Sequence, residues 1–117
     1  MQSQIELKCE ELPGKAAAKL VRFIGDLDAT NVESVVEEIF SLLNSGVVNI
    51  VADFEKLRYV NSTGLGILLH FSKSAKEKQG CFKIANVNEN VYEIIEIIGA
   101  TTLLEIFDDV DDAVKTL

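Results

Sequence analysis

Two patterns of apolar residues, one typical of strands and one typical of helices, alternate along this chain of 117 residues. Short runs that are mostly apolar, or apolar at every second residue, are typical of β-strands, whereas apolar residues three and four apart are typical of amphipathic helices. The patterns predict strands at 5–9, 18–24, 47–52, 81–85 and 103–107, and helices at about 32–43, 62–79, 89–98 and 108–117. This alternation of strands and helices predicts an α/β fold.

The first two strands are separated by Leu12-Pro13-Gly14, a combination typical of a turn, so we expect them to form a hairpin. The remaining strands alternate with helices, which predicts a mixed β-sheet covered mainly by about four helices. After the strand that ends near Asp53 we expect a loop from Phe54 to Asn61. No repeat or linker interrupts the pattern, so residues 1–117 are expected to form a single domain.

The chain is acidic, with 11 Lys and Arg residues against 19 Asp and Glu residues and a formal charge of −8. From residue 88 onward, eight acids face one base. This charge argues against nucleic acid or an anionic membrane as the main partner, because phosphate binding needs a basic face. No apolar run is long enough to cross a membrane and no signal peptide is visible, so we expect a cytoplasmic protein.

No metal, cofactor or catalytic site is expected. The single histidine, His70, and the two separated cysteines, Cys9 and Cys81, give no zinc or disulfide pattern. No phosphate-binding loop or dinucleotide fingerprint is present, and no nucleophile can be paired with a base. The sequence therefore favours a binding or regulatory protein over an enzyme.

One segment has a composition that strand and helix formation alone do not explain. It is YVNSTGLG at residues 59–66. Asn61, Ser62 or Thr63 could cap the helix that follows. Capping does not explain two glycines in the first turns, where each costs up to about 1 kcal/mol relative to alanine. Glycine allows another molecule to approach the backbone closely. At helical spacing, one face that we expect to dock a partner would carry Ser62, Gly66, His70 and Lys73.

A hydroxyl at a helix N-terminus is also a favourable place for a phosphate, because the free N–H groups and the helix dipole stabilise negative charge. Such a modification would change the surface charge while leaving the helix intact. From the residues alone, a capping role and a phosphorylation site both remain open for Ser62.

The central part of the chain resembles STAS domains, in particular the anti-sigma factor antagonists of bacteria. The residues that carry the resemblance are VNIVADFEKLRYVNSTGLGILLHFSKSAKEKQG. It extends upstream to RFIGDLDATNVESVVEEI and downstream through FKIANVNENVYEIIEIIGATTLLEIFDDVDDAV, and so covers about residues 5–117. The resemblance implies a single STAS domain.

The resemblance also implies roles for individual residues. Ser62 occupies the position of the family's phospho-acceptor serine, and Thr63 is an alternative acceptor. Asp28 matches an acidic position near the acceptor, whereas Asn61 stands where the best-known members have Asp. The complete set of expected partner-binding residues is Asp28, Asn61, Ser62, Thr63, Gly64, Gly66, His70 and Lys73.

In this family, the unphosphorylated protein binds an anti-sigma factor that is also a serine kinase, and the sigma factor is released. Phosphorylation then breaks the complex, and a phosphoserine phosphatase restores the binding form. The resemblance therefore implies a phosphoprotein that regulates transcription by partner switching at Ser62.

Two alternatives remain open at this point. One is a response-regulator receiver domain phosphorylated at Asp53, with Glu10 and Glu11 as the metal-binding acidic pair. Against it, a turn and a second strand follow Glu10 and Glu11, where a receiver has a helix. The other alternative is a STAS binding module that works without phosphorylation.

Overall fold

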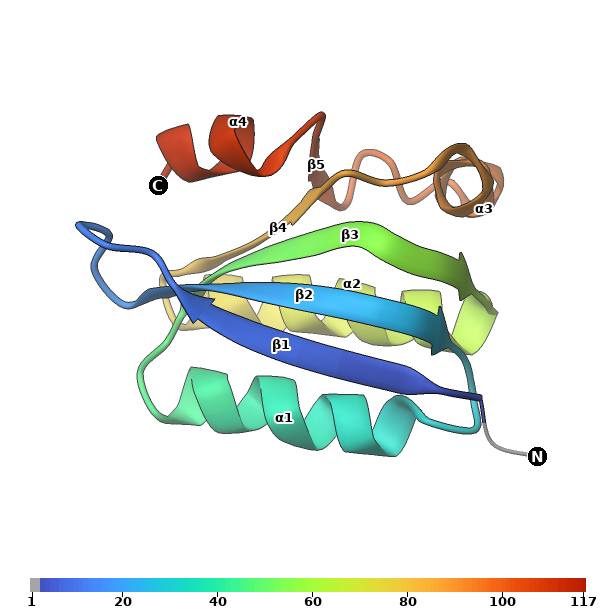
Figure 1. Cartoon of the computed structure of the whole chain (residues 1–117), viewed down its shortest axis with the longest axis horizontal. Helices are drawn as coiled ribbons and strands as arrows, with labels where there is room; N and C mark the ends of the chain where they lie inside the picture. The colour runs from blue at the N-terminus through green and yellow to red at the C-terminus, as the bar shows by residue number, and fades with distance from the viewer. Residues whose placement is uncertain (1–2) are drawn as a thin grey trace.

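A five-stranded sheet with the order β1-β2-β3-β4-β5 forms the centre of the molecule in this computed structural model, which describes residues 3–117 (Figure 1). The strands are β1 (Ile5–Glu11), β2 (Ala18–Leu27), β3 (Asn49–Val60), β4 (Cys81–Ala85) and β5 (Glu105–Phe107). β1 pairs with β2 in the antiparallel sense, and every other pairing is parallel. The predicted opening hairpin and mixed sheet are therefore confirmed.

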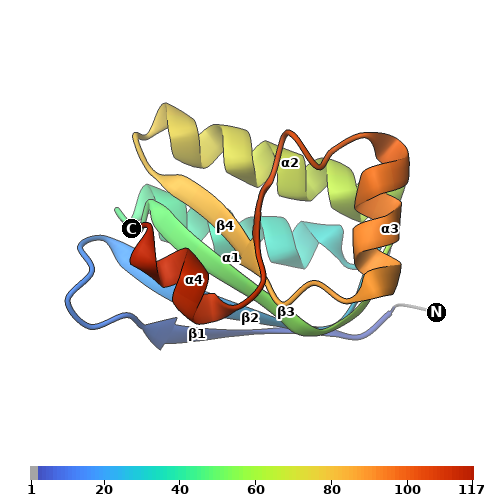
Figure 2. The same ribbon diagram turned by 90° about the horizontal axis from the view of Figure 1, so that it is seen from above.

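Four helices cover this sheet, as predicted: α1 (Val32–Asn44), α2 (Ser62–Glu77), α3 (Glu89–Ile98) and α4 (Val110–Lys115). α1 and α2 lie side by side on one face, and α4 lies on the other (Figures 1 and 2). α3 lies beside the end of β3, and its buried side chains join the core beneath α1 and α2. Within residues 3–117, no helix has the length and apolar character needed to cross a membrane.

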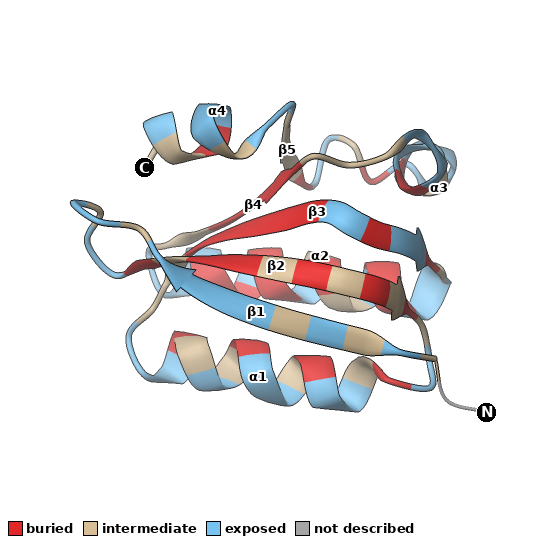
Figure 3. Ribbon diagram, in the orientation of Figure 1, coloured by how far each residue is buried: buried red, intermediate tan, exposed pale blue. Residues whose placement is uncertain are grey.

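The core is concentrated on the central strands and the inner faces of the helices, while the edge strand β1 is largely exposed (Figure 3). The largest cluster of buried side chains includes Phe23 of β2, Phe54 of β3 and Phe71 of α2. Phe23 and Phe54 meet edge to face, with ring centroids 5.1 Å apart. This packing fixes α2 against the sheet and so fixes the position of its N-terminus.

The predicted loop from Phe54 to Asn61 is wrong, because β3 continues to Val60. Two irregularities in the pairing with β2, one after Asp53 and one after Leu57, interrupt the two-residue alternation that would have marked a strand. The extension pairs Val60 with Leu27, the last residue of β2. α2 therefore begins at the carboxyl edge of the sheet, directly beyond the ends of β2 and β3.

The last strand is shorter than predicted. β5 begins at Glu105, and Leu103 lies in the preceding turn with 57% of its surface exposed. Only three residues of this segment pair with β4. The apolar side chain of Leu103 therefore lies on the molecular surface.

Candidate functional site

The N-terminus of α2 is capped by Asn61. Its backbone is extended, and its side-chain oxygen accepts a hydrogen bond from the backbone N–H of Gly64 at 2.8 Å. Its own N–H donates to the carbonyl of Leu27 at 3.1 Å. Of the three candidate caps in the sequence, Asn61 is therefore the one that satisfies the helix terminus.

Ser62 and Thr63 follow this cap as exposed residues of the first turn. No hydrogen bond found among residues 3–117 uses either hydroxyl. The first turn of α2 contains no acidic residue of its own, so nothing within that turn offsets the positive end of the helix dipole. The Ser62 hydroxyl is consequently accessible and has a local field that favours an added phosphate.

Asp28 lies in the turn that follows β2. The hydrogen bond between Leu27 and Asn61 brings this turn beside the start of α2. The Asp28 carboxylate accepts hydrogen bonds from the hydroxyl of Ser3, and from the N–H and hydroxyl of Thr30 at 2.9 and 2.6 Å. These bonds, Ser3 first, hold the pKa of Asp28 below its ordinary value. Asp28 therefore adds a fixed negative charge to the surroundings of α2.

Asn31, which no pattern in the sequence singles out, holds this turn in place. Its side chain is buried, donates to the carbonyls of Ser3 and Asp26 at 3.1 and 2.8 Å, and accepts from the N–H of Asp28 at 3.1 Å. One amide thus joins the N-terminal segment, the end of β2 and the start of α1. A burial pattern would not identify it, because polar side chains are mostly exposed.

The exposed side of α2 carries the residues that the sequence placed together. Ser62, Gly66, His70 and Lys73 are all exposed. The His70 ring rests against Phe40 of α1, with ring centroids 5.3 Å apart. The face is therefore accessible to a partner, while its role in binding stays a prediction.

Gly64 differs from this group because it is buried. A Cβ atom there would come within 2.9 Å of the Leu27 carbonyl oxygen and 2.8 Å of a Val60 methyl group. A Cβ atom on Gly66 would meet nothing within 4 Å. The expectation that both glycines present open backbone to a partner is therefore wrong for Gly64, whose missing side chain lets α2 pack against β2.

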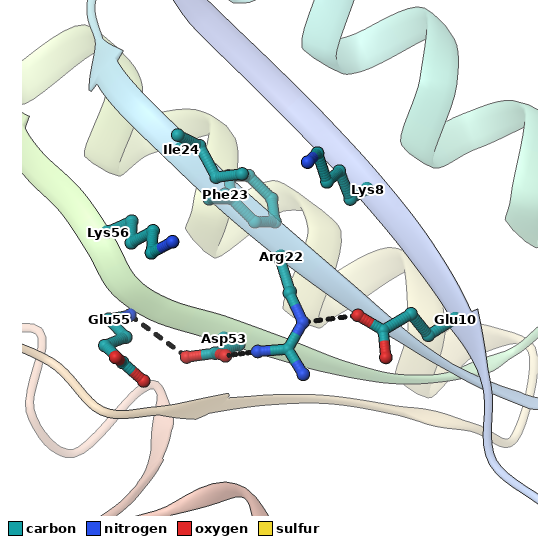
Figure 4. Close-up of a pocket in the computed structure, with 8 residues that line it drawn as sticks. All are labelled: Lys8, Glu10, Arg22, Phe23, Ile24, Asp53, Glu55 and Lys56. Carbon is teal, nitrogen blue, oxygen red and sulfur yellow. Dashed lines mark hydrogen bonds and ion pairs between the residues drawn. The ribbon is translucent and has the colours of Figure 1, made fainter.

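A second polar cluster surrounds Asp53 in a concavity of about 320 Å³ on β1, β2 and β3 (Figure 4). The Asp53 side chain is only 3% exposed and pairs with the Arg22 guanidinium at 2.6 Å. Arg22 also pairs with Glu10. The other Asp53 oxygen accepts from the Asn86 amide and the Glu55 N–H, both at 3.0 Å. Every oxygen of this carboxylate is thus used within the fold.

This arrangement overturns the receiver alternative. A receiver domain has a parallel doubly wound sheet with the order 2-1-3-4-5, whereas here β1 is antiparallel to β2 and the order is sequential. Glu10 is bound to Arg22 and does not form an acidic site with Asp53. Across residues 3–117, no group of three His, Cys, Asp or Glu side chains could hold a metal ion.

An Asp53→Asn variant is expected to lose about 1–3 kcal/mol of unfolding free energy, because Arg22 and Asn86 lose a buried charged acceptor. Urea denaturation measures the loss. Stability equal to that of the unsubstituted protein would contradict the structural role assigned to this residue.

The comparisons with known proteins agree with this fold. The STAS domain family model matches residues 10–113. An anti-sigma-B factor antagonist of Listeria monocytogenes is 27% identical over 84 residues, which are 70% of this chain and 72% of the relative.

Two solved structures match nearly the whole chain. An anti-sigma factor antagonist from Mycobacterium paratuberculosis has a TM-score of 0.84 at 18% identity, covering 97% of this chain and 93% of that one. The unphosphorylated form of the anti-sigma factor antagonist SpoIIAA has a TM-score of 0.76 at 20% identity, covering 96% and 98%. At these identities the structures establish the fold.

Proposed function

Because this chain belongs to the STAS domain family, we propose that it is an anti-sigma factor antagonist switched by phosphorylation of Ser62. In the unphosphorylated form it binds an anti-sigma factor in the bacterial cytoplasm and so frees a sigma factor. The anti-sigma factor is also the serine kinase, and a phosphoserine phosphatase reverses the modification. The names of relatives such as the Listeria protein support the antagonist role.

The observation that carries the switch is the exposed Ser62 hydroxyl at the first turn of α2, which has no hydrogen bond within the described fold. Asn61 already caps the helix, so a change at Ser62 leaves the cap intact. The kinase would transfer the terminal phosphoryl group of ATP to the Ser62 oxygen, with ADP leaving and the hydroxyl proton passing to the kinase. The chain is a substrate and a binding partner in this scheme, and not a catalyst.

Phosphorylation would weaken binding through charge. A phosphoserine adds a charge of about −1.5 to −2 at pH 7. This charge would lie near the ionised Asp28 and inside the surface that a partner must cover. Desolvating an unpaired phosphate in an interface is unfavourable, and any acidic group of the partner would be repelled. The phosphorylated protein therefore binds the anti-sigma factor more weakly than the unphosphorylated protein does.

Phosphosite mapping tests this proposal. The purified protein is incubated with ATP and an extract of its own host, and acid-stable phosphate is expected on Ser62. Ser62→Ala should abolish labelling, whereas Thr63→Ala should retain it. The reverse pattern would move the acceptor to Thr63. Absence of phosphate on both residues, with a kinase-competent extract, would contradict the switch and favour a STAS binding module that works without phosphorylation.

A further inference from the structure

A partly apolar groove lies between α2 and the turn that precedes β5. It has a volume of about 440 Å³, and its lining residues are Leu69, Ser72, Lys73, Lys76, Glu77 and Leu103. Leu69 from the helix and Leu103 from the turn supply its apolar walls. Leu103 is 57% exposed, so a large apolar side chain is left on the surface beside a concavity that could receive another one.

The groove lies on the same side of α2 as Ser62. Steps of four, three and four residues lead along α2 from Ser62 through Gly66 and Leu69 to Lys73, which places them on one stripe of the helix. At 1.5 Å per residue, Leu69 lies about 10 Å and Lys73 about 16 Å from Ser62 along the axis. An ordinary protein interface covers about 800 Å² per partner, a patch wide enough to include both Ser62 and the groove.

The charge around the groove is opposite to that of the protein as a whole. The chain carries a formal charge of −8, yet Lys73 and Lys76 line the groove with Glu77 as the only acid among its lining residues. A basic partner segment is attracted by the protein as a whole, but at this groove it would meet two lysines. A partner segment that carries an apolar side chain with carboxylates beside it would match this groove. The apolar side chain would pack against Leu69 and Leu103, and the carboxylates would lie near Lys73 and Lys76.

We propose that the anti-sigma factor that covers Ser62 also inserts an apolar side chain, flanked by carboxylates, between Leu69 and Leu103. This inference rests on the proposed function and adds a second contact to the interface around Ser62. The contact is remote from the phosphorylated oxygen, so it contributes equally to binding the ground state and the transition state of phosphoryl transfer. Loss of such binding raises KM and leaves kcat unchanged.

The test uses the purified kinase that labels Ser62. Leu103→Ala and Lys73→Glu should each weaken its binding about tenfold, and should raise the KM for this protein by a similar factor at unchanged kcat. Ile97→Ala is the matched apolar control, because Ile97 is 74% exposed but does not line the groove. Lys78→Glu, at the C-cap of the same helix, is the charge control. Both controls should bind within twofold of the unsubstituted protein, and all four variants should keep its melting temperature.

Each other outcome has a definite meaning. Normal binding by the groove variants, alongside lost binding by Ser62→Asp, would overturn this inference and leave the proposed function standing. Absence of any kinase or partner for Ser62 would overturn both. A dimer of the unsubstituted protein that Leu103→Ala converts to a monomer, measured by light scattering, would assign the groove to a second copy of this chain and overturn the inference.

Discussion

A Ser62→Asp variant is expected to bind the anti-sigma factor at least about 30-fold more weakly than the unsubstituted protein, an effect of about 2 kcal/mol. The substitution places a carboxylate in the first turn of α2, close to Asp28, on a surface that the partner must desolvate. Isothermal titration calorimetry with the purified anti-sigma factor measures the change. Binding equal to that of the unsubstituted protein would contradict a charge-based switch.

Ser62→Ala is the matched control for this effect. It removes the phosphate acceptor without adding charge, so it should bind as tightly as the unphosphorylated protein and stay bound in the presence of ATP. Neither substitution should lower the melting temperature, because Asn61 provides the cap and a carboxylate near a helix N-terminus is favourable by about 0.3–1 kcal/mol. A large loss of stability in either variant would show that Ser62 is mainly structural.

A Gly64→Ala variant is expected to lose about 3 kcal/mol of unfolding free energy. Its Cβ atom would lie 2.9 Å from a backbone oxygen, that of Leu27, and 2.8 Å from the Val60 side chain. The Val60 side chain could rotate away from the added Cβ atom. The Leu27 carbonyl oxygen cannot, because it is part of the backbone and also accepts the hydrogen bond from the Asn61 N–H. The cost of forcing this contact exceeds the gain of about 1 kcal/mol in helix propensity.

Gly66→Ala, two residues further along the same helix, should raise the unfolding free energy instead of lowering it. Open space surrounds the added Cβ atom, so the variant should gain about 0.5–1 kcal/mol from helix propensity. Urea denaturation of both variants compares them under one condition. Equal losses at Gly64 and Gly66 would contradict the assignment of a packing role to Gly64 alone.

The kinds and order of the elements could be predicted because each one buries a regular face. The end of β3 could not, since the irregular pairing around Lys56 and Tyr59 removes the alternation on which the prediction depends. Leu103 was predicted to begin the last strand because apolar residues are usually paired and buried there. In the structure it is in a turn, and no local pattern distinguishes an exposed leucine from a buried one.

The candidate site was only partly visible in the sequence. The segment around Ser62 was conspicuous because two glycines and several hydroxyls interrupt an otherwise ordinary helix. The difference between Gly64 and Gly66 depends on Leu27, which is 37 residues from Gly64 in the chain and adjacent only after folding. The groove likewise joins Leu69 to Leu103 across two intervening elements. Contacts of this kind follow from the topology and not from local spacing.

Because Asn61 caps α2, phosphorylation of Ser62 would not need a change in the fold. Because the Ser62 hydroxyl supports no hydrogen bond in the described fold, adding or removing a phosphate there requires no rearrangement between two folded shapes. The state of each molecule would then be recorded in one covalent bond, whose lifetime depends on the kinase and the phosphatase and not on a conformational barrier. In a population of such molecules, the fraction able to bind the anti-sigma factor would equal the fraction without phosphate.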